Sequence, residues 1–494
     1  MKIKRNIFLF LFIIIPASFI SIFFLKDINV LKNSFRKFIQ ENITEENRAL
    51  VKKFIFPYRE IDILKKNLYK TTATSNSFEQ VLDYMATIAL ENDLQIKEKL
   101  LNLEFQKSPI IKTLSDSGNT SELEIKLKKY TPYKNILLRG INNPIPSSAY
   151  LEHYDNKLFL LSSIGVLAYS EPDEKKLDFK QIKNNINEFI GENQFKKKGL
   201  SHEEIKQTLP FSVKDLLIHN NKIYLSFTNE VSKNCWNTSV IYSDLNYENI
   251  DFKPLFAPKE CVNSINNPDN VFLALQSGGR IVSFDNNHIL LSTGDYRNRF
   301  LAQDKESSFG KILKININDK TYKVISMGSR NIQGLFVDQI NEFILFTEHG
   351  PKGGDEINIL SKEMISDIEI PNYGWAISSY GFHYRNTPDT KKYPLYKSHK
   401  KYGFVEPLKY FTPSIGISEI IGIDLNQKLY LVSSLSNHGL YLMKLNEKNE
   451  IIKFERLSAD ERIRDLITFQ GNLYLFLEDT GSIGVIELDN FVMK

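Results

Sequence analysis

Short apolar runs separated by polar turns dominate the chain from about residue 133 onward. Six times a polar turn is followed by five or six strand-forming residues, at 157–161, 222–227, 288–293, 342–347, 428–433 and 472–477. Most of these runs follow an asparagine or a glycine, which favour tight turns. The six recurrences predict an all-β domain over residues 133–494, a six-bladed β-propeller, with an irregular β-sandwich as the alternative.

The spacing of the recurrences is irregular but averages about sixty residues, more than a minimal four-stranded blade needs, so long loops are expected. Two stretches interrupt the pattern. Residues 181–209 contain Ser201 and Glu204 at the spacing of a helix capping box, and residues 380–410 are rich in tyrosine and lysine. Because long loops on one rim carry function, either stretch is a candidate cover for the mouth of the central channel.

An uncharged apolar run begins at Ile7 and ends at Leu25, and it is long enough to cross a bilayer as a helix. Three basic residues precede it, and positive residues stay on the cytoplasmic side. We therefore expect a membrane anchor over residues 1–26 and an extracytoplasmic location for the rest, at the periplasmic face of the inner membrane if the source is bacterial. A cleaved signal peptide is the alternative, because Pro16 could end a short apolar region.

Residues 27–132 are polar and rich in helix formers, and they predict a mainly helical stalk between the anchor and the β-domain. The formal net charge of the 494-residue chain is only +4, with lysines and acids intermixed, which argues against a nucleic-acid partner. The two cysteines, Cys235 and Cys261, either pair in an oxidising compartment or remain two buried thiols.

The segment 348–358, with the sequence EHGPKGGDEIN, crowds glycine, proline and carboxylates into a turn after a strand-like run. Glycines let backbone carbonyls point into one cavity, and carbonyls together with carboxylates suit a hard cation such as calcium. Other motifs stand upstream, at 278–281 (GGRI), 294–295 (GD), 310–313 (GKIL) and 328–335 (GSRNIQGL).

In order and spacing these motifs resemble the glucose/sorbosone dehydrogenase family, six-bladed propellers that bind pyrroloquinoline quinone (PQQ). The resemblance covers roughly residues 209–488. It implies that PQQ and calcium are cofactors, with two backbone carbonyls holding the metal, those of Gly350 and Pro351. It also implies a set of side chains that contact PQQ: Arg330, Asn331, Gln333, Arg462 and Arg464. Such residues fit the ligand, because guanidinium groups bind carboxylates in bidentate fashion.

The chain departs from the family where a catalytic histidine is expected, because Gln276 stands at that position. Glutamine cannot accept a proton near neutral pH. His349 and Asp355 are the candidate replacement bases, and Arg330 is the candidate for polarising the quinone oxygen. Ser436 stands where the family has a cofactor-binding lysine.

The resemblance implies an extracytoplasmic, membrane-anchored sugar dehydrogenase that oxidises an aldose or related polyol and passes electrons to an acceptor in the membrane or periplasm. The alternative is a non-catalytic propeller of the same family that binds calcium or a glycan, which Gln276 and Ser436 favour. A calcium-dependent propeller hydrolase that uses the carboxylates near Asp355 is a third possibility.

Overall fold

The computed structural model describes residues 102–108, 111–114, 125–132, 149–162, 165–190, 213–268, 271–365, 369–384 and 391–491. The chain divides into two compact units, Met1–Phe78 and Glu79–Lys494, and every described residue belongs to the second. The predicted anchor and most of the predicted stalk therefore lie outside the described residues. Among the residues that are described, no helix is long and apolar enough to cross a membrane.

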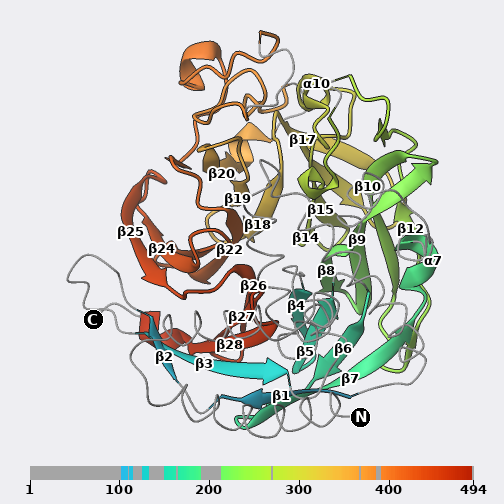
Figure 1. Cartoon of the computed structure of the whole chain (residues 1–494), viewed down its shortest axis with the longest axis vertical. Coiled ribbons are helices and arrows are strands. Elements are labelled where there is room, and N and C mark those ends of the chain that lie inside the picture. Colours follow the sequence, from blue (N-terminus) through green and yellow to red (C-terminus); the bar gives the residue numbers. More distant parts are fainter. Residues whose placement is uncertain are drawn as a thin grey trace, which may run out of the picture. The chain divides into compact units, whose positions relative to one another are not determined.

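The second unit is built from sheets arranged around a common centre (Figure 1). Each blade is a four-stranded antiparallel meander. The first three blades have these strands: β4(Ala149–Tyr154), β5(Lys157–Ser162), β6(Leu167–Ser170) and β7(Lys176–Asn184); β8(Val213–His219), β9(Lys222–Ser232), β10(Cys235–Asp244) and β12(Lys253–Phe256); β14(Gly278–Asp285), β15(His288–Thr293), β16(Lys311–Asn316) and β17(Tyr322–Met327). Two short strands flank the second blade: β11(Asn249–Ile250), which pairs with β7, and β13(Val262–Asn263), which pairs with β10.

The fourth and fifth blades are equally regular: β18(Ile332–Asp338), β19(Phe343–Glu348), β20(Asp355–Ser361) and β21(Lys409–Phe411); β22(Ile417–Asp424), β23(Leu429–Ser434), β24(Gly439–Leu445) and β25(Ile451–Ser458). The sixth blade has three strands from the end of the chain, β26(Ile463–Phe469), β27(Asn472–Leu477) and β28(Ser482–Glu487). The innermost strands contact one another in a closed order, β4, β8, β14, β18, β22, β26 and again β4. The described sheets thus form the predicted six-bladed propeller.

The six recurring runs found in the sequence are the second strands of the six blades. They read as continuous apolar stretches because both faces of each strand are buried between neighbouring blades; all six residues of β19 are buried, for example. Leu160, Leu225, Leu291, Leu345 and Leu475 are fully buried at the middle of such strands. The core therefore lies between the blades, and its apolar packing holds the inner strands in register.

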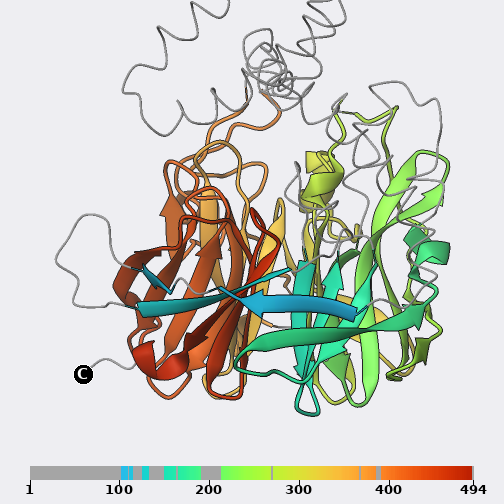
Figure 2. The same ribbon diagram turned by 60° about the horizontal axis from the view of Figure 1, so that its bottom comes forward.

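The fourth strand of blade 6 comes from the N-terminal side of the domain. It is β3(Ile125–Pro132), which pairs with β28 and closes the ring. On its other side β3 pairs with β1(Asn102–Lys107) and with β2(Lys112–Leu114). The second partner of β1 is β7, so β1 joins the outer edges of blades 6 and 1 (Figure 2).

The predicted boundary between stalk and propeller at residue 133 is therefore wrong. Residues 102–107, 112–114 and 125–132 are strands of the propeller and not part of a helical stalk. Their apolar side chains explain the pairing: Phe105, Leu114, Ile125 and Leu127 are buried against the neighbouring blades.

Among the described residues, helices are few and short: α7(Ile186–Ile190), α10(Arg299–Gln303) and four 3-10 turns, η1(Ala274–Gln276), η2(Lys362–Met364), η3(Lys400–Tyr402) and η4(Leu488–Phe491). Long loops, among them the one with α10, gather on one rim, whereas short turns connect the strands at the other (Figure 2). Cys235 and Cys261 form a disulfide in blade 2, which decides between the two predicted states of these residues.

Candidate functional site

The predicted site residues gather at one rim because of the register of the blades. Because the first two strands of each blade are antiparallel, the start of the first strand and the end of the second strand lie on the same side of the blade. Gly278 pairs with Thr293 in blade 3, and Ile332 pairs with Glu348 in blade 4. Segments that precede β14 and β18, or follow β15 and β19, therefore meet on this rim.

Gln276, at the position of the family's catalytic histidine, lies in a buried polar network. Its amide is assigned so that nitrogen faces a carboxylate: Nε2 donates to Asp295 Oδ1 at 2.9 Å, and Oε1 accepts from Arg330 Nη2 at 2.7 Å. The other Asp295 oxygen accepts from Trp375 Nε1 at 2.7 Å. Burial raises the pKa of Asp295, and the charge of Arg330 opposes that rise.

Arg330 lies between this network and the glycine-proline loop. Its Nη1 donates to the carbonyl oxygens of His349 and Gly350, each at 2.8 Å, and its guanidinium lies 5.5 Å from the centre of the Trp375 ring. The Arg330 amide nitrogen donates to Glu348 at 2.8 Å, which fixes the backbone where β18 begins. Arg330 therefore points a buried positive charge toward Gln276.

The other predicted PQQ-binding residues form a continuous chain of hydrogen bonds. Asn331 Oδ1 accepts from Gln333 Nε2 at 3.1 Å, and Gln333 Oε1 accepts from Arg464 Nη1 at 3.1 Å. Arg464 and Arg462 then donate through their Nε atoms to the two oxygens of Glu478, at 2.6 and 2.9 Å. The structure thus links four of the five side chains that the resemblance assigned to PQQ, whereas the fifth, Arg330, precedes Asn331 in the sequence and contacts Gln276 and the glycine-proline loop.

The sequence predictions assigned no role to two acidic residues of this region, although one of them, Asp295, belongs to a quoted motif. Glu478 directly follows β27 and is fully buried, with a backbone amide that donates to Arg462 O. Asp295 follows β15, in the corresponding place of blade 3, and is also fully buried. Both stand just beyond the second strand of a blade, so counting from the recurring apolar runs would have found them.

Asp355 has a different environment from that of a general base. Its Oδ2 accepts from the backbone amides of Gly416 and Ile417 at 2.7 and 3.0 Å, and its Oδ1 accepts from the Gly350 amide at 3.2 Å. Burial acts to raise the pKa of Asp355, but His349, 3.7 Å away, and the Ile417 amide hold it below its usual value. The carboxylate is ionised and ties the 348–358 loop to blade 5.

The predicted calcium ligands already have donors in this structure. The Gly350 carbonyl accepts from Arg330, and the Pro351 carbonyl accepts from the Gly354 amide at 3.0 Å and from Ser414 Oγ at 3.3 Å. Within the described ranges, no group of three or more histidine, cysteine, aspartate or glutamate residues is placed to hold a metal ion. The protein atoms present therefore do not fit calcium without rearrangement.

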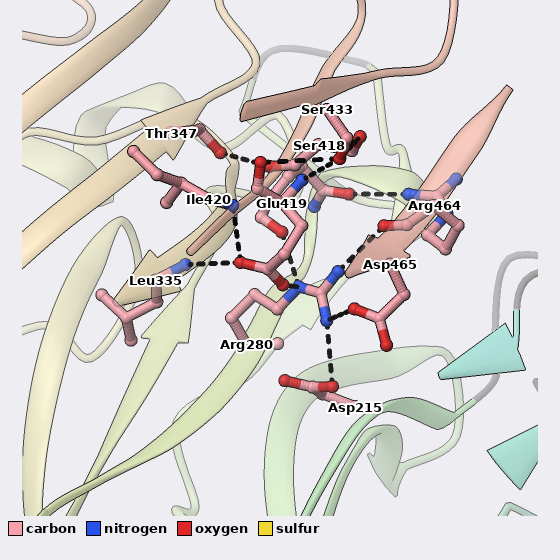
Figure 3. Close-up of polar contacts among 12 residues, drawn as sticks. Asp215, Arg280, Leu335, Thr347, Ser418, Glu419, Ile420, Ser433, Arg464 and Asp465 are labelled. Atoms are coloured by element: carbon pink, nitrogen blue, oxygen red, sulfur yellow. Dashed lines mark hydrogen bonds and ion pairs between the residues drawn. The ribbon is translucent and has the colours of Figure 1, made fainter. Parts of the chain in front are cut away.

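Arg280, from the GGRI motif, lies among the inner strands (Figure 3). Its guanidinium contacts three buried carboxylates on three other inner strands: Asp215 at 3.0 Å, Glu419 at 2.8 Å and Asp465 at 2.7 Å. It also donates to the carbonyls of Gln333 and Arg464.

The three carboxylates in turn accept from backbone amides of neighbouring inner strands, those of Leu151, Ile281 and Leu335, and Glu419 also accepts from the amide of Ile420 on its own strand. All six inner strands thus contribute to one cluster, which we call the axial hub (Arg280, Asp215, Glu419 and Asp465). Burial raises the pKa of Asp215 to about 7 and that of Glu419 to about 8, and Arg280 opposes both rises.

The insertion over residues 380–410 lies against the loop that follows β15. The Arg297 guanidinium is 5.5 Å from the centre of the Tyr384 ring, and that of Arg299 is 5.0 Å from the Tyr393 ring. Farther round the rim, the backbone amide of Ser436 donates a hydrogen bond to the carbonyl oxygen of Ile415, just before the first strand of blade 5. The insertion thus meets the rim at blade 3, beside Gln276.

The closed ring of six sheets and its arginine-rich rim define a six-bladed β-propeller with a candidate site for an anionic ligand. The family model described as Glucose / Sorbosone dehydrogenase matches residues 212–485, more than half of the chain, and the chain belongs to this family. This finding confirms the resemblance carried by the motifs.

Two curated proteins are similar over part of the chain. An uncharacterized protein of Synechocystis is 30% identical over 217 residues, covering 38% of this chain and 50% of that protein. The aldose sugar dehydrogenase YliI of Escherichia coli is 27% identical over 225 residues, covering 41% and 57%. The chain thus spans about half the length of the curated relatives it matches.

Solved structures agree on the fold. A glucose dehydrogenase crystal structure has a TM-score of 0.53 at 22% identity, with 68% of this chain and 95% of that one covered. The soluble aldose sugar dehydrogenase of Escherichia coli in its apo-form has a TM-score of 0.51 at 20% identity, with coverages of 68% and 94%.

Proposed function

We propose that the chain binds PQQ at the rim formed by blades 3, 4 and 6 and oxidises a sugar there. The observation that carries this proposal is the hydrogen-bonded chain from Asn331 through Gln333 and Arg464 to Arg462, with Arg330 beside it. These are the side chains that the resemblance assigns to PQQ. The names of the similar proteins, dehydrogenases of glucose and of aldose sugars, support the same substrate class.

The charges at the rim fit such a cofactor. Arg462 and Arg464 share one carboxylate, Glu478, so this group keeps a net positive charge. PQQ is a flat quinone with three carboxylates, and guanidinium groups bind carboxylates and stack on flat rings. Calcium has no such fit, and we assign it no step; its binding, together with PQQ, stays a prediction from the resemblance.

When bound, PQQ supplies an oxidant that accepts hydride from the sugar carbon. Arg462 and Arg464 hold and orient carboxylates, and Arg330 stabilises negative charge that develops on an oxygen beside Gln276. The sugar hydroxyl must also lose its proton, and Gln276 cannot accept it. Both Asp355 oxygens are engaged by backbone amides. We therefore expect slow turnover, because a positioned base contributes about 10²- to 10⁴-fold.

A second candidate function is a non-catalytic sugar- or cofactor-binding module. The observation that favours it is the position of Gln276, whose amide is satisfied on one side by Asp295 and on the other by Arg330. A site that only binds a sugar or a cofactor needs such fixed side chains but no catalytic base.

Titration of the full chain with PQQ, with and without calcium, followed by dye-linked oxidation of aldoses, separates these proposals. Binding of PQQ with slow sugar oxidation supports the first, and binding without turnover supports the second. If the chain binds no PQQ under either condition, the result contradicts both the PQQ-dependent oxidation and the binding of PQQ without turnover.

We also propose that residues 7–25 anchor the protein, that the propeller lies outside the cytoplasm, and that its electrons pass to an acceptor in the membrane or periplasm. The disulfide between Cys235 and Cys261 supports an oxidising compartment. Protease accessibility of the propeller in intact cells or spheroplasts tests the location; a propeller protected until the membrane is lysed would contradict it.

A further inference from the structure

The tyrosine- and lysine-rich insertion beside Gln276 is fixed to two loops of the candidate site. In the loop that follows β15, the Arg297 guanidinium lies 5.5 Å from the centre of the Tyr384 ring, and Arg297 Nε donates to Gln276 Oε1 at 3.2 Å. In the glycine-proline loop, Lys352 and Phe382 exchange two backbone hydrogen bonds, at 3.1 and 2.8 Å. The insertion therefore continues the surface of the rim outward from Gln276.

Every exposed large apolar side chain in the described part of the insertion (380–384 and 391–410) is aromatic. Elsewhere among the described residues, most exposed large apolar side chains are aliphatic. A surface that docks on a protein or on lipid tails also uses aliphatic side chains, whereas flat rings alone suit a partner that is itself built of rings. The exposed rings of the insertion belong to Phe382, Tyr384, Tyr396, Tyr402 and Tyr410.

Four tyrosines of the insertion form two stacked pairs. Tyr410 stacks on Tyr380, with ring centres 3.7 Å apart and planes 5° apart. Tyr396 stacks on Tyr402, with ring centres 3.9 Å apart and planes 8° apart. Stacking holds each ring in one orientation before a ligand arrives, which lowers the entropy that binding costs. Because Tyr396, Tyr402 and Tyr410 are each more than a third exposed, ring surface remains open to solvent.

Further contacts join the two stacked pairs. The His399 ring stacks on that of Tyr380 with ring centres 5.4 Å apart, and its carbonyl accepts from the Tyr402 amide at 3.0 Å. Lys397 Nζ lies 4.1 Å from the centre of the Phe382 ring, so this ring is held as well. The rings thus form one surface, which we call the aromatic platform (Phe382, Tyr384, Tyr396, Tyr402 and Tyr410).

We propose that the aromatic platform binds a glycan chain, one terminal unit of which reaches Gln276. Pyranose rings present apolar C–H faces that pack on aromatic rings, while tyrosine hydroxyls and lysine ammonium groups bond to the sugar hydroxyls. The platform continues directly into the rim at Tyr384, so further units of a chain would lie on it. The choice of substrate rests on the proposed function, which it narrows from aldoses in general to oligosaccharides and polysaccharides.

Calorimetric titration of the full chain with hexasaccharides and their monosaccharides tests the proposal. The pairs are maltohexaose with D-glucose, chitohexaose with N-acetylglucosamine, and hexagalacturonate with galacturonate. At least one hexasaccharide should bind about tenfold or more tighter than its own monosaccharide, because several stacked rings add to the contact at Gln276. The proposal is overturned if no hexasaccharide binds more tightly than its monosaccharide, or if a thymidylate hexamer binds as tightly as the best of them.

Three variants assign the gain in affinity to the platform. Tyr410→Ala should weaken hexasaccharide binding by about twofold to tenfold, whereas Tyr410→Phe, which keeps the ring, should not. Tyr322→Ala is the matched control: Tyr322 is 43% exposed, against 47% for Tyr410, and lies on the outer strand of blade 3 as Tyr410 lies on that of blade 4. All three should leave the affinities for the monosaccharide and for PQQ unchanged.

Tyr402→Ala probes the second stacked pair and should weaken hexasaccharide binding as Tyr410→Ala does. Unchanged affinity in both alanine variants, or an equal loss in Tyr322→Ala, would overturn the proposal. In a chain that turns over, Tyr410→Ala should raise the KM for the hexasaccharide by the factor seen in binding and leave kcat as it was.

Failure of the proposed function has a different outcome from failure of the platform. A chain that binds no PQQ but prefers the hexasaccharide through Tyr410 would retain the platform and lose the oxidation. A chain that binds PQQ and oxidises glucose, yet binds each hexasaccharide no more tightly than its monosaccharide, would retain the oxidation and lose the platform.

Discussion

At the scale of single residues, Gln276 decides how fast the proposed oxidation runs. Replacing it with histidine puts an imidazole beside Asp295, which now accepts from the Gln276 amide at 2.9 Å. A histidine held by a carboxylate is a competent base near neutral pH. We expect Gln276→His to raise dye-linked turnover by about 10²- to 10⁴-fold.

Gln276→Asn is the control for that substitution, because asparagine cannot accept a proton either, and its turnover should not rise. Equal rates for the histidine and asparagine variants would show that proton removal does not limit the reaction.

Glu478 holds two arginines with one buried carboxylate, and its removal should be costly. Glu478→Gln leaves Arg462 and Arg464 without their ionic partner, and we expect the free energy of unfolding to fall by about 3 kcal/mol. Because PQQ brings carboxylates of its own, PQQ should restore part of that loss. Chemical denaturation with and without PQQ measures both effects.

Glu447→Gln serves as the comparison, because Glu447 is 96% exposed and pairs with Lys428 only at the surface. It should leave the unfolding curve unchanged. A Glu478 variant as stable as the unaltered chain would show that the two arginines do not need the carboxylate.

The sequence predicted the residues that are recognisable by type and spacing, such as Arg330, Arg462 and Arg464. It did not predict their partners. The role of Glu478 follows from the antiparallel pairing of β26 with β27, which places residues 462 and 478 side by side. Asp295 was visible in a motif, but its contact with Gln276 depends on how two loops meet.

At the scale of elements, β1 contributes to two blades at once. Phe105 is fully buried in a cluster with Phe179 of blade 1 and Phe476 of blade 6. We expect Phe105→Ala to lower the free energy of unfolding by about 3 to 5 kcal/mol, as for other large-to-small core substitutions. Gln106→Ala, exposed on the same strand, should change it by less than about 0.5 kcal/mol.

Thermal or urea unfolding of the two β1 variants makes the comparison. Equal destabilisation by both would contradict the burial of Phe105 between blades.

The disulfide of blade 2 restrains the unfolded chain across a separation of 26 residues. Replacing both cysteines with serine should lower the free energy of unfolding by about 3 kcal/mol. Without the cross-link the unfolded chain has more conformational entropy, and folding must then close a loop of this size. The unaltered chain measured with a reductant should behave like the double variant. If reduction leaves the denaturation midpoint where it was, the bond contributes nothing.

Elements were predicted best where burial is uniform. The second strand of every blade is apolar throughout because it is covered on both faces, so it stands out in the sequence. The strands β1, β2 and β3 were missed, since their pairing partners lie at the far end of the chain or in another blade and their local composition is polar. Local patterns carry no information about such distant pairing.

At the scale of the whole molecule, the axial hub links stability to pH. Its carboxylates Asp215 and Glu419 have folded-state pKa values of about 7 and about 8, raised by burial. Between their ordinary values near 4 and these raised values the folded state binds more protons than the unfolded state, so stability falls as pH rises. The contribution of these two groups to the free energy of unfolding is greatest below about pH 4 and is lost by about pH 8.

Denaturation midpoints should therefore decrease as the pH is raised from 5 to 8.5. In the Asp215→Asn variant, whose amide does not titrate, the midpoint should depend less steeply on pH. A midpoint that rises over the same range in the unaltered chain would show that other groups dominate.

The pairing of β3 with β28 also sets the order in which the molecule is completed. Tyr130 pairs with Ile483, so the ring cannot close until residue 483 has left the ribosome. While the intervening blades are being synthesised, the edge of β3 that later pairs with β28 has no partner strand and can pair with another chain. Contacts so distant in sequence make folding slow. The cell must therefore protect one early strand for as long as it takes to make all the others.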